Sequence, residues 1–281
     1  KKLNTPFGGV SSAQDHGLFG RMHQAGVKWF VIKPVAGSLA EGVFLHQTAD
    51  QVFQYLQANP KESFLVEQHI AGFEHRVYVV DGVAVSAYRR VPNHVVGNGA
   101  DNVRTLFAAR QDQRKRNPLM VDKPADMAEI EMALVGRGGR WSDVPAQGQT
   151  VWLAANALPS RQGDYIPSLD TLPEGAKRLA VDAARAVSAY NAGLDMIVQP
   201  SGEAYVLEIN IRAWIGSHSF PHPNGAYNLT VPTALIQSLF GPPKTAPRPL
   251  LGFDFQALGV EVFCEGRTSK GVEAADSAQF C

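Results

Sequence analysis

Two apolar runs in the last third of the sequence each carry a carboxylate. Asp195 lies in the run 194–198 and Glu208 in the run 204–209, with Pro200-Ser201-Gly202 between them. A proline-glycine turn between two such runs predicts an antiparallel hairpin. Burying an acid is costly unless a cation or hydrogen bonds compensate for it. The sequence therefore predicts a β-sheet that carries a polar site on one of its faces.

Asn210 adds a third oxygen donor to this hairpin. Residues two apart on a strand point to the same face, so Glu208 and Asn210 are expected side by side, with Asp195 across from them. Three oxygen ligands suit Mg²⁺, and Mn²⁺ is an alternative. We therefore predict a metal site formed by Asp195, Glu208 and Asn210.

The composition narrows the class of protein. The 281 residues hold 26 Lys and Arg against 26 Asp and Glu, so the net charge is zero, which argues against a dedicated nucleic-acid binder. Neither a membrane-length apolar run nor a signal peptide is visible. Cys264 and Cys281 lack the spacing of a zinc ribbon or a disulfide framework. We expect a cytoplasmic protein without nucleic-acid or membrane partners.

Local patterns predict the remaining elements. Asp81-Gly82 between the apolar runs 76–80 and 83–88 is a strong hairpin signal. The segment 91–99 is expected to be a loop, and the basic run 110–117 a solvated helix end. We expect further strands at 27–32, 43–45, 63–66 and 150–154, and helices at 49–57, 102–113, 129–135, 174–191 and 229–240.

Two further groups suggest nucleotide chemistry. Lys33 ends a strand before a loop of small residues, where it could meet phosphate oxygens, although the loop does not match the GxxxxGK[ST] pattern. Glu67 closes the next strand, and Glu74 follows seven residues later; such a carboxylate can accept two ribose hydroxyls. Taken singly, each of these residues is more often an ordinary exposed charge.

Several motifs occur in one order. They are Lys33-Pro34 with Glu41-Gly42-Val43, the segment 66–74 (VEQHIAGFE), Glu74-His75-Arg76, the segment 89–99 (RRVPNHVVGNG), Asp143-Val144-Pro145 with Gly148, Asn156, Asp195, and Leu207-Glu208-Ile209-Asn210. Together they resemble the ATP-grasp superfamily, and most closely the ATP-grasp region of cyanophycin synthetase and of the bifunctional glutathione synthetases.

The resemblance implies an α+β fold in which two α+β subdomains clamp ATP. The smaller, lid-forming subdomain would be residues 27–70, and the larger one, with the metal site, residues 71–240. Residues 1–26 would be the remnant of an N-terminal region or a linker, and 241–281 have no assignment. The N-terminal domain usual in this family would be absent from this sequence or truncated.

The resemblance also implies a role for each site residue. Arg76 and Arg90 would lie near the transferred phosphate or a substrate carboxylate, and Arg212 could grip a carboxylate. His94 and Asn156 would line the acceptor region. The nucleotide would be held by Lys33 with the loop residues Ser38 and Gly42, by the adenine hinge from Glu67 through His69 to Ile70, and by Glu74 at the ribose. Asp195, Glu208 and Asn210 would hold Mg²⁺.

The implied function is ATP-dependent carboxylate–amine ligation through an acylphosphate, with release of ADP, on amino acids or small peptides. A nucleotide-binding module without catalysis and a carboxylate kinase are the alternatives. Three departures stand out. The family's upstream ATP-binding lysine is not found, Ile211-Arg212-Ala213 follows Asn210 where relatives typically have Pro-Gly, and Asn98 stands where relatives often have Asp. The oligomeric state stays open, a homo-oligomer included.

Overall fold

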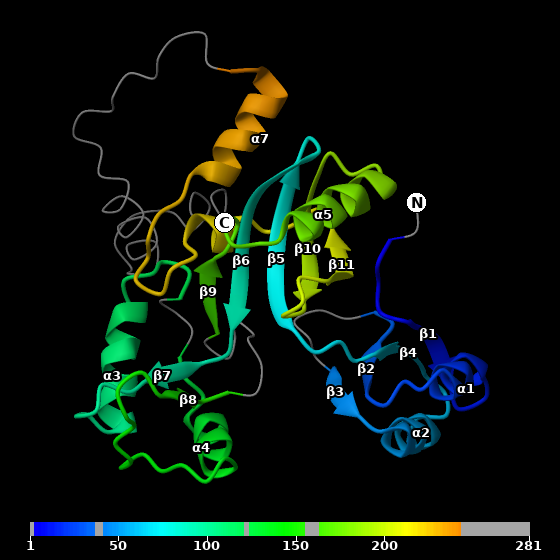
Figure 1. The fold of residues 1–281 in the computed structure, drawn as a ribbon, viewed down its shortest axis with the longest axis horizontal. Coiled ribbons are helices and arrows are strands. Elements are labelled where there is room, and N and C mark those ends of the chain that lie inside the picture. Colours follow the sequence, from blue (N-terminus) through cyan, green and yellow to red (C-terminus); the bar gives the residue numbers. More distant parts are fainter. Residues whose placement is uncertain (1–2, 37–41, 121–123, 155–162, 243–281) are drawn as a thin grey trace, which may run out of the picture.

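The computed structural model describes residues 3–36, 42–120, 124–154 and 163–242. Its centre is a five-stranded antiparallel sheet with the strand order β11-β10-β5-β6-β9 (Figure 1). The strands are β5 (Phe73–Val80), β6 (Val83–Val91), β9 (Asp164–Pro167), β10 (Asn191–Val198) and β11 (Ala204–Asn210). The expected α+β architecture is confirmed, as are both expected hairpins, β5–β6 and β10–β11.

The turn of the β5–β6 hairpin explains why that prediction was accurate. Asp81 and Gly82 have φ of 47° and 74°, and a two-residue turn with both φ positive matches the twist of the strands that it joins. Because β5 starts where β6 ends, this turn places Phe73 and Val91 at the same end of the sheet.

Each face of the central sheet is covered differently. Helix α5 (Glu174–Ala186) packs on one face through small buried residues such as Ala180 and Ala183, against Val77 and Leu194. On the other face, Tyr78 and Val80 contact Val231 of α7 (Thr230–Phe240). The expectation that α5 reaches residue 191 was wrong, because Ser188 has a φ of 52° and the chain enters β10 at Asn191.

A separate four-stranded antiparallel sheet has the order β1-β4-β2-β3. It is built from β1 (Gly8–Ser12), β2 (Phe30–Pro34), β3 (Phe44–Gln47) and β4 (Ser63–Gln68), with the helices α1 (Gly17–Gln24) and α2 (Ala49–Ala58). Thr48 and Gln51 form a capping box at the start of α2, where a helix start was expected. Strand β2 starts three residues later than predicted.

The first 26 residues were not expected to belong to this sheet and its core. Strand β1 pairs with β4 along its whole length, and Phe19 and Met22 of α1 are buried in the same core as Phe30 and Val66. The prediction placed residues 1–26 outside the small subdomain, whereas these contacts place most of them inside its sheet and core. The division of the chain into two subdomains stays a prediction.

A third part forms a small lobe between β6 and β9. It contains β7 (His94–Val96), α3 (Val103–Arg114), α4 (Met127–Val135) and β8 (Thr150–Trp152). Strand β7 pairs with β8, so residues 94–96 are not the loop that we expected. Val95, Phe107, Ile130, Leu134 and Leu153 share its core.

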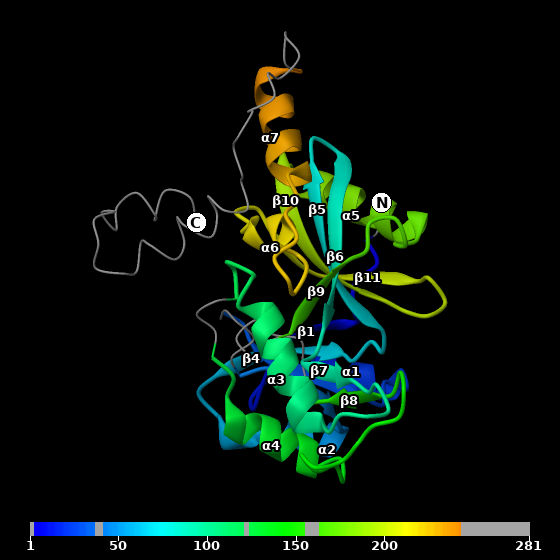
Figure 2. The same ribbon diagram turned by 90° about the vertical axis from the view of Figure 1, so that its left-hand side faces the viewer.

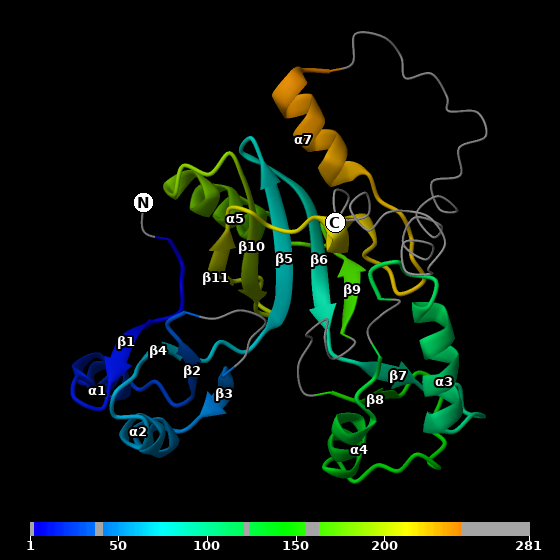
Figure 3. The same cartoon turned by 180° about the vertical axis from the view of Figure 1, so that it is seen from behind.

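The small sheet and the lobe lie at the same end of the central sheet, on either side of the β5–β6 hairpin (Figures 1 and 3). This follows from the hairpin, since the small sheet leads into the start of β5 and the lobe follows the end of β6. Helix α7 lies at the opposite end (Figure 2). None of the helices in the described ranges has the length and apolar character needed to cross a membrane.

Candidate functional site

Four charged side chains gather on the face of the central sheet that points away from α5. We call Glu74, Arg76, Arg90 and Asp195 the central ionic cluster. Arg76 and Asp195 are register partners on β5 and β10, and Arg76 Nε lies 3.3 Å from Asp195 Oδ1. Arg90 on β6 reaches the same oxygen with Nη2 at 3.1 Å, and its Nη1 pairs with Glu74. Arg90 therefore bridges two carboxylates that were predicted to have separate roles.

Three of the four charged side chains, Arg76, Arg90 and Asp195, are largely shielded from water. Asp195 is 7% exposed. Burial raises the pKa of the Asp195 carboxyl, and Arg90 and Arg76 oppose this shift. Burial acts to lower the pKa of Arg90, but Glu74 and Asp195 outweigh it and raise that pKa. Because Asp195 Oδ1 makes ion pairs but no well-aligned hydrogen bond, it remains an acceptor with unused capacity.

Gly193 makes room for this arrangement. A Cβ at residue 193 would lie 2.5 Å from the Ala213 Cβ and about 3.3 Å from Arg76 Nη1. Arg76 Nη1 also lies 3.4 Å from the Gly193 carbonyl oxygen, which accepts a long hydrogen bond from it. A side chain at residue 193 would clash with Ala213 and crowd Arg76.

The predicted metal ligands lie on neighbouring strands. Asp195 is directly opposite Glu208, Gly193 is opposite Asn210, and the ladder is interrupted just after Asp195 by a bulge. Glu208 is exposed and Asn210 is half-buried. Within the described ranges, no three His, Cys, Asp or Glu side chains are arranged to hold a metal. The predicted set therefore depends on Asn210 as the third oxygen donor, and its donor chemistry and the spare acceptor of Asp195 fit Mg²⁺.

Lys33 and Glu67 meet on the small sheet. They lie on the paired strands β2 and β4, and Lys33 Nζ is 2.6 Å from Glu67 Oε2. Both side chains are partly shielded, with exposures of 25% and 14%. Gly8 of β1 lies opposite Glu67, where a Cβ would be 2.5 Å from the Val66 carbonyl oxygen. The two residues predicted to serve phosphate and adenine are therefore one ion pair.

The predicted hinge continues from this pair. His69 donates its backbone N–H to the Trp29 carbonyl over 2.8 Å, and its ring lies 5.1 Å from the ring of His46. Burial and the nearby His46 lower the pKa of His69. Ile70 is buried. The segment leaves the small sheet and enters β5 one residue before Glu74.

Other predicted residues lie apart from these groups or outside the described ranges. Arg212 is exposed in the turn after β11, and the ion pairs of the described residues do not include it. Gly42 has a φ of 68°, and a Cβ there would lie 3.0 Å from Pro34. Ser38, Asn156, Cys264 and Cys281 lie outside the described residues.

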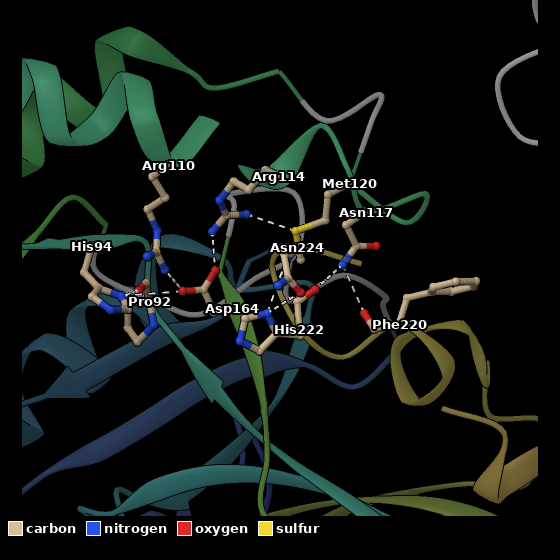
Figure 4. Close-up of polar contacts among 10 residues, drawn as sticks. All are labelled: Pro92, His94, Arg110, Arg114, Asn117, Met120, Asp164, Phe220, His222 and Asn224. Carbon is tan, nitrogen blue, oxygen red and sulfur yellow. Dashed lines mark hydrogen bonds and ion pairs between the residues drawn. The ribbon is translucent and has the colours of Figure 1, made fainter. Parts of the chain in front are cut away.

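A second buried charge cluster was missed by the sequence reasoning. Asp164 on β9, fully buried, pairs with Arg110 and Arg114 of α3, the latter through Nη2 at 2.5 Å (Figure 4). His94 Nδ1 donates to the Pro92 carbonyl over 2.8 Å and lies 3.8 Å from Asp164 Oδ2. Burial lowers the pKa of Arg110 to about 10 and that of Arg114 to about 9, so both guanidinium groups stay charged at neutral pH.

The expectation of a solvated basic run was therefore wrong at Arg110 and Arg114. The sequence does contain a pattern that indicates this burial. One face of the helix is formed by Val103, Phe107, Arg110 and Arg114, so the two arginines share a face with apolar residues. Asn117, just beyond the helix, donates its Nδ2 to the carbonyl oxygens of Phe220 and His222, at 3.1 and 2.6 Å (Figure 4). The run anchors the lobe to the central sheet.

Two buried histidines lie near the central ionic cluster, His75 between Glu74 and Arg76 on β5 and His218 in the segment after β11. His218 Nδ1 lies 2.9 Å from Ser86 Oγ, and its ring contacts those of Tyr78 and Tyr88. Burial and then Arg76 and Arg90 lower its pKa to about 3. Burial and Arg89 lower the pKa of His75 to about 4. Both rings are neutral at physiological pH.

No known protein-family model matches the chain. It is similar to proteins named glutathione biosynthesis bifunctional protein GshAB. The one from Desulfotalea psychrophila is 28% identical over 243 residues, which cover 78% of this chain and 30% of that protein. The one from Mannheimia succiniciproducens is 30% identical over 225 residues, 73% of this chain and 29% of that protein. This chain therefore spans about 30% of the length of these relatives.

A solved structure agrees with these matches. The crystal structure of a bifunctional glutathione synthetase from Pasteurella multocida superimposes with a TM-score of 0.62 at 25% sequence identity. The alignment covers 85% of this chain and 34% of that one.

Removing the shared carboxylate of the second cluster should destabilise the protein. Asp164→Asn leaves two buried guanidinium groups without their counter-ion, and we expect a loss of about 3–5 kcal/mol in the free energy of unfolding. Urea unfolding followed by circular dichroism measures it. Asp112→Asn is the matched control, because its ion pair with Lys115 lies on the exposed side of the same helix. Equal midpoints for the two variants would contradict the role assigned to Asp164.

The buried histidines should make stability depend on pH. Their folded-state pKa values, about 4 for His75 and about 3 for His218, lie below the ordinary value of 6.5. The unfolded chain then binds more protons below pH 6.5, so stability is present above that pH and is lost as the pH falls toward 4. Each histidine contributes up to about 1.4 kcal/mol per pH unit.

Urea unfolding between pH 7 and 4.5 tests this linkage. His218→Asn and His75→Asn, each made singly, should show a shallower decline of stability with acidification than the unsubstituted chain. If both variants keep its full slope, other groups account for the acid sensitivity.

Proposed function

We propose that this chain, which has the ATP-grasp fold, is an ATP- and Mg²⁺-dependent carboxylate–amine ligase. It would act on amino acids or small peptides in the cytoplasm. The observation that carries the proposal is the central ionic cluster beside Glu208, where arginines and carboxylates share one sheet face. The relatives named for glutathione biosynthesis support it, since that name describes the synthesis of a small peptide.

In the proposed reaction the substrate carboxylate attacks the γ-phosphorus of ATP. The bond from that phosphorus to the bridging oxygen breaks, and ADP leaves. An amine then attacks the acyl carbon, phosphate departs with the bonding electrons, and the amine loses a proton as the amide forms. Charge neutralisation and in-line placement are what the site must supply.

Each candidate residue of the chain would bind a different part of the substrates. Arg76 and Arg90 present planar guanidinium groups that suit a substrate carboxylate or the transferred phosphoryl group. Lys33 would hold ATP phosphates, and Glu74 the ribose, with Glu67 to Ile70 at the base. Arg212, in the turn after β11, would grip the acceptor's carboxylate.

Asp195, Glu208 and Asn210 would hold Mg²⁺, which supplies charge neutralisation for the phosphate oxygens. Asp195 and Glu208 are suitably opposed, and the central cluster keeps Asp195 in place. Since Arg90 pairs with Glu74 and lies against Asp195, nucleotide binding would require Arg90 to release Glu74 and turn toward the phosphates.

The proposal predicts that ADP release requires both substrates. A phosphate-release screen on the full chain, with amino acids and dipeptides in pairs, should show turnover only when a carboxylate and an amine are both present. Turnover with the carboxylate alone, trapped by hydroxylamine, would identify a carboxylate kinase. Nucleotide binding without turnover on any pair would identify a non-catalytic module.

Asp195→Asn should lower the rate of ADP release by roughly 100-fold or more, because it removes a charge from the metal- and phosphate-binding face. Glu203→Gln is the control, since Glu203 is exposed at the far end of the same hairpin. A rate for Asp195→Asn within twofold of that control would rule out the metal role.

Lys33→Met should weaken ADP binding by roughly tenfold, because a charged hydrogen bond to phosphate is lost. Isothermal titration calorimetry on the full chain measures the dissociation constant. Lys28→Met is the control, as Lys28 is exposed just ahead of the same strand. Unchanged affinity in Lys33→Met would place the phosphates elsewhere.

A further inference from the structure

Two histidine rings lie next to each other on the small sheet without making hydrogen bonds. The ring centroid of His46, on β3, lies 5.1 Å from that of His69, just after β4, and the ring planes are tilted by 46°. Among the described residues, no hydrogen bond or ion pair involves either ring, whereas the rings of His75 and His218 each pair with a serine hydroxyl. Within that part of the chain, the nitrogens of the His46–His69 pair are therefore available to a ligand.

Unlike the buried histidines, this pair can be reached from solvent. His46 is exposed and His69 is half-buried. Trp29, whose ring centroid lies 4.0 Å from that of His46, is 43% exposed. A small ligand can therefore reach the pair without displacing the core of the sheet.

The backbone and Trp29 hold the two rings in place. The His69 N–H donates to the Trp29 carbonyl over 2.8 Å, which fixes the segment after β4 beside the start of β2. His46 has a φ of 58°, a left-handed conformation that is uncommon outside glycine. Its ring packs on the Trp29 ring. Because both rings are held before a ligand arrives, little ordering is needed for them to share one.

The separation of the rings suits a single metal ion. With metal–nitrogen distances of about 2.0–2.1 Å, two imidazoles on one tetrahedral ion have ring centroids roughly 5 Å apart. The observed separation of 5.1 Å agrees with this value. Imidazole nitrogen suits Zn²⁺, Ni²⁺ and Cu²⁺, whereas Mg²⁺ prefers oxygen. We propose that His46 and His69 bind one divalent transition-metal ion, with water or a small chelating molecule in its other coordination positions.

Two protein ligands make an exchangeable site rather than a structural one. Within the described ranges, no third His, Cys, Asp or Glu joins the pair to hold a metal, and structural zinc sites have four protein ligands. A bound ion would connect β3 to the segment 67–70 and restrain that segment while it stays bound. The inference does not depend on the proposed function, because it needs neither ATP nor a substrate.

Titration with a metal alone tests the proposal. Isothermal titration calorimetry uses the full, untagged chain with Cys264→Ser and Cys281→Ser, which excludes thiolate ligands, and excess Mg²⁺ to occupy oxygen-donor sites. Ni²⁺ should bind with one equivalent, and His46→Asn and His69→Asn should each weaken that binding at least about tenfold. His23→Asn is the control and should leave it unchanged, because His23 is an exposed histidine on α1.

Electron paramagnetic resonance of bound Cu²⁺ supplies a second measurement, because each coordinated imidazole nitrogen splits the signal. We expect two such nitrogens in the chain with both histidines and one in each single variant, with circular dichroism confirming the fold of each. Ni²⁺ affinity of His46→Asn/His69→Asn equal to that of His23→Asn would show that the metal binds elsewhere and overturn the proposal. A Cu²⁺ spectrum unchanged by both single substitutions would overturn it as well.

Discussion

Arg90 lies between Glu74 and Asp195, and this bridge constrains the rest of the central sheet. Arg76 and Asp195 are register partners, so their side chains share one face of β5 and β10. A slip of β5 by one residue would turn Arg76 toward the small apolar residues of α5 and leave Asp195 on the other face. A charge left unpaired there would cost far more than the pair contributes. The cluster thus fixes the register of β5 against β10, whereas the turn between β10 and β11 places Glu208 opposite Asp195.

Buried charges that need a partner also position the lobe. Strand β9 ends the central sheet, and Asp164 at its start holds two arginines of α3. Met120 packs against Tyr88 and Tyr165 of the sheet. Asn117 adds polar contacts, because it donates to two carbonyls of the segment after β11. Such contacts are directional, so they set the orientation of the lobe as well as its distance.

Local signals predicted the elements whose partners are close in sequence. Asp81-Gly82 and the turn 200–202 specify hairpins, and the opposition of Asp195 and Glu208 follows from the second one. Strands β1 and β7 were missed because each pairs with a strand more than 50 residues away. The burial of Arg110 likewise depends on Asp164, which no local pattern connects to α3. The roles of the individual site residues depend on ligands, which the sequence pattern alone does not place.

The neutral composition conceals an uneven distribution of charge that matters for ligand binding. Glu74, Arg76, Arg90 and Asp195 balance one another, and Glu208 across the bulge adds one negative charge. A divalent cation is attracted to that excess, and a polyphosphate is attracted to the cation and to the two arginines. Because neither ligand meets a fully complementary charge alone, each should favour the binding of the other. A neutral cluster of paired charges can therefore remain stable before the ligands arrive and still exchange its partners when they do.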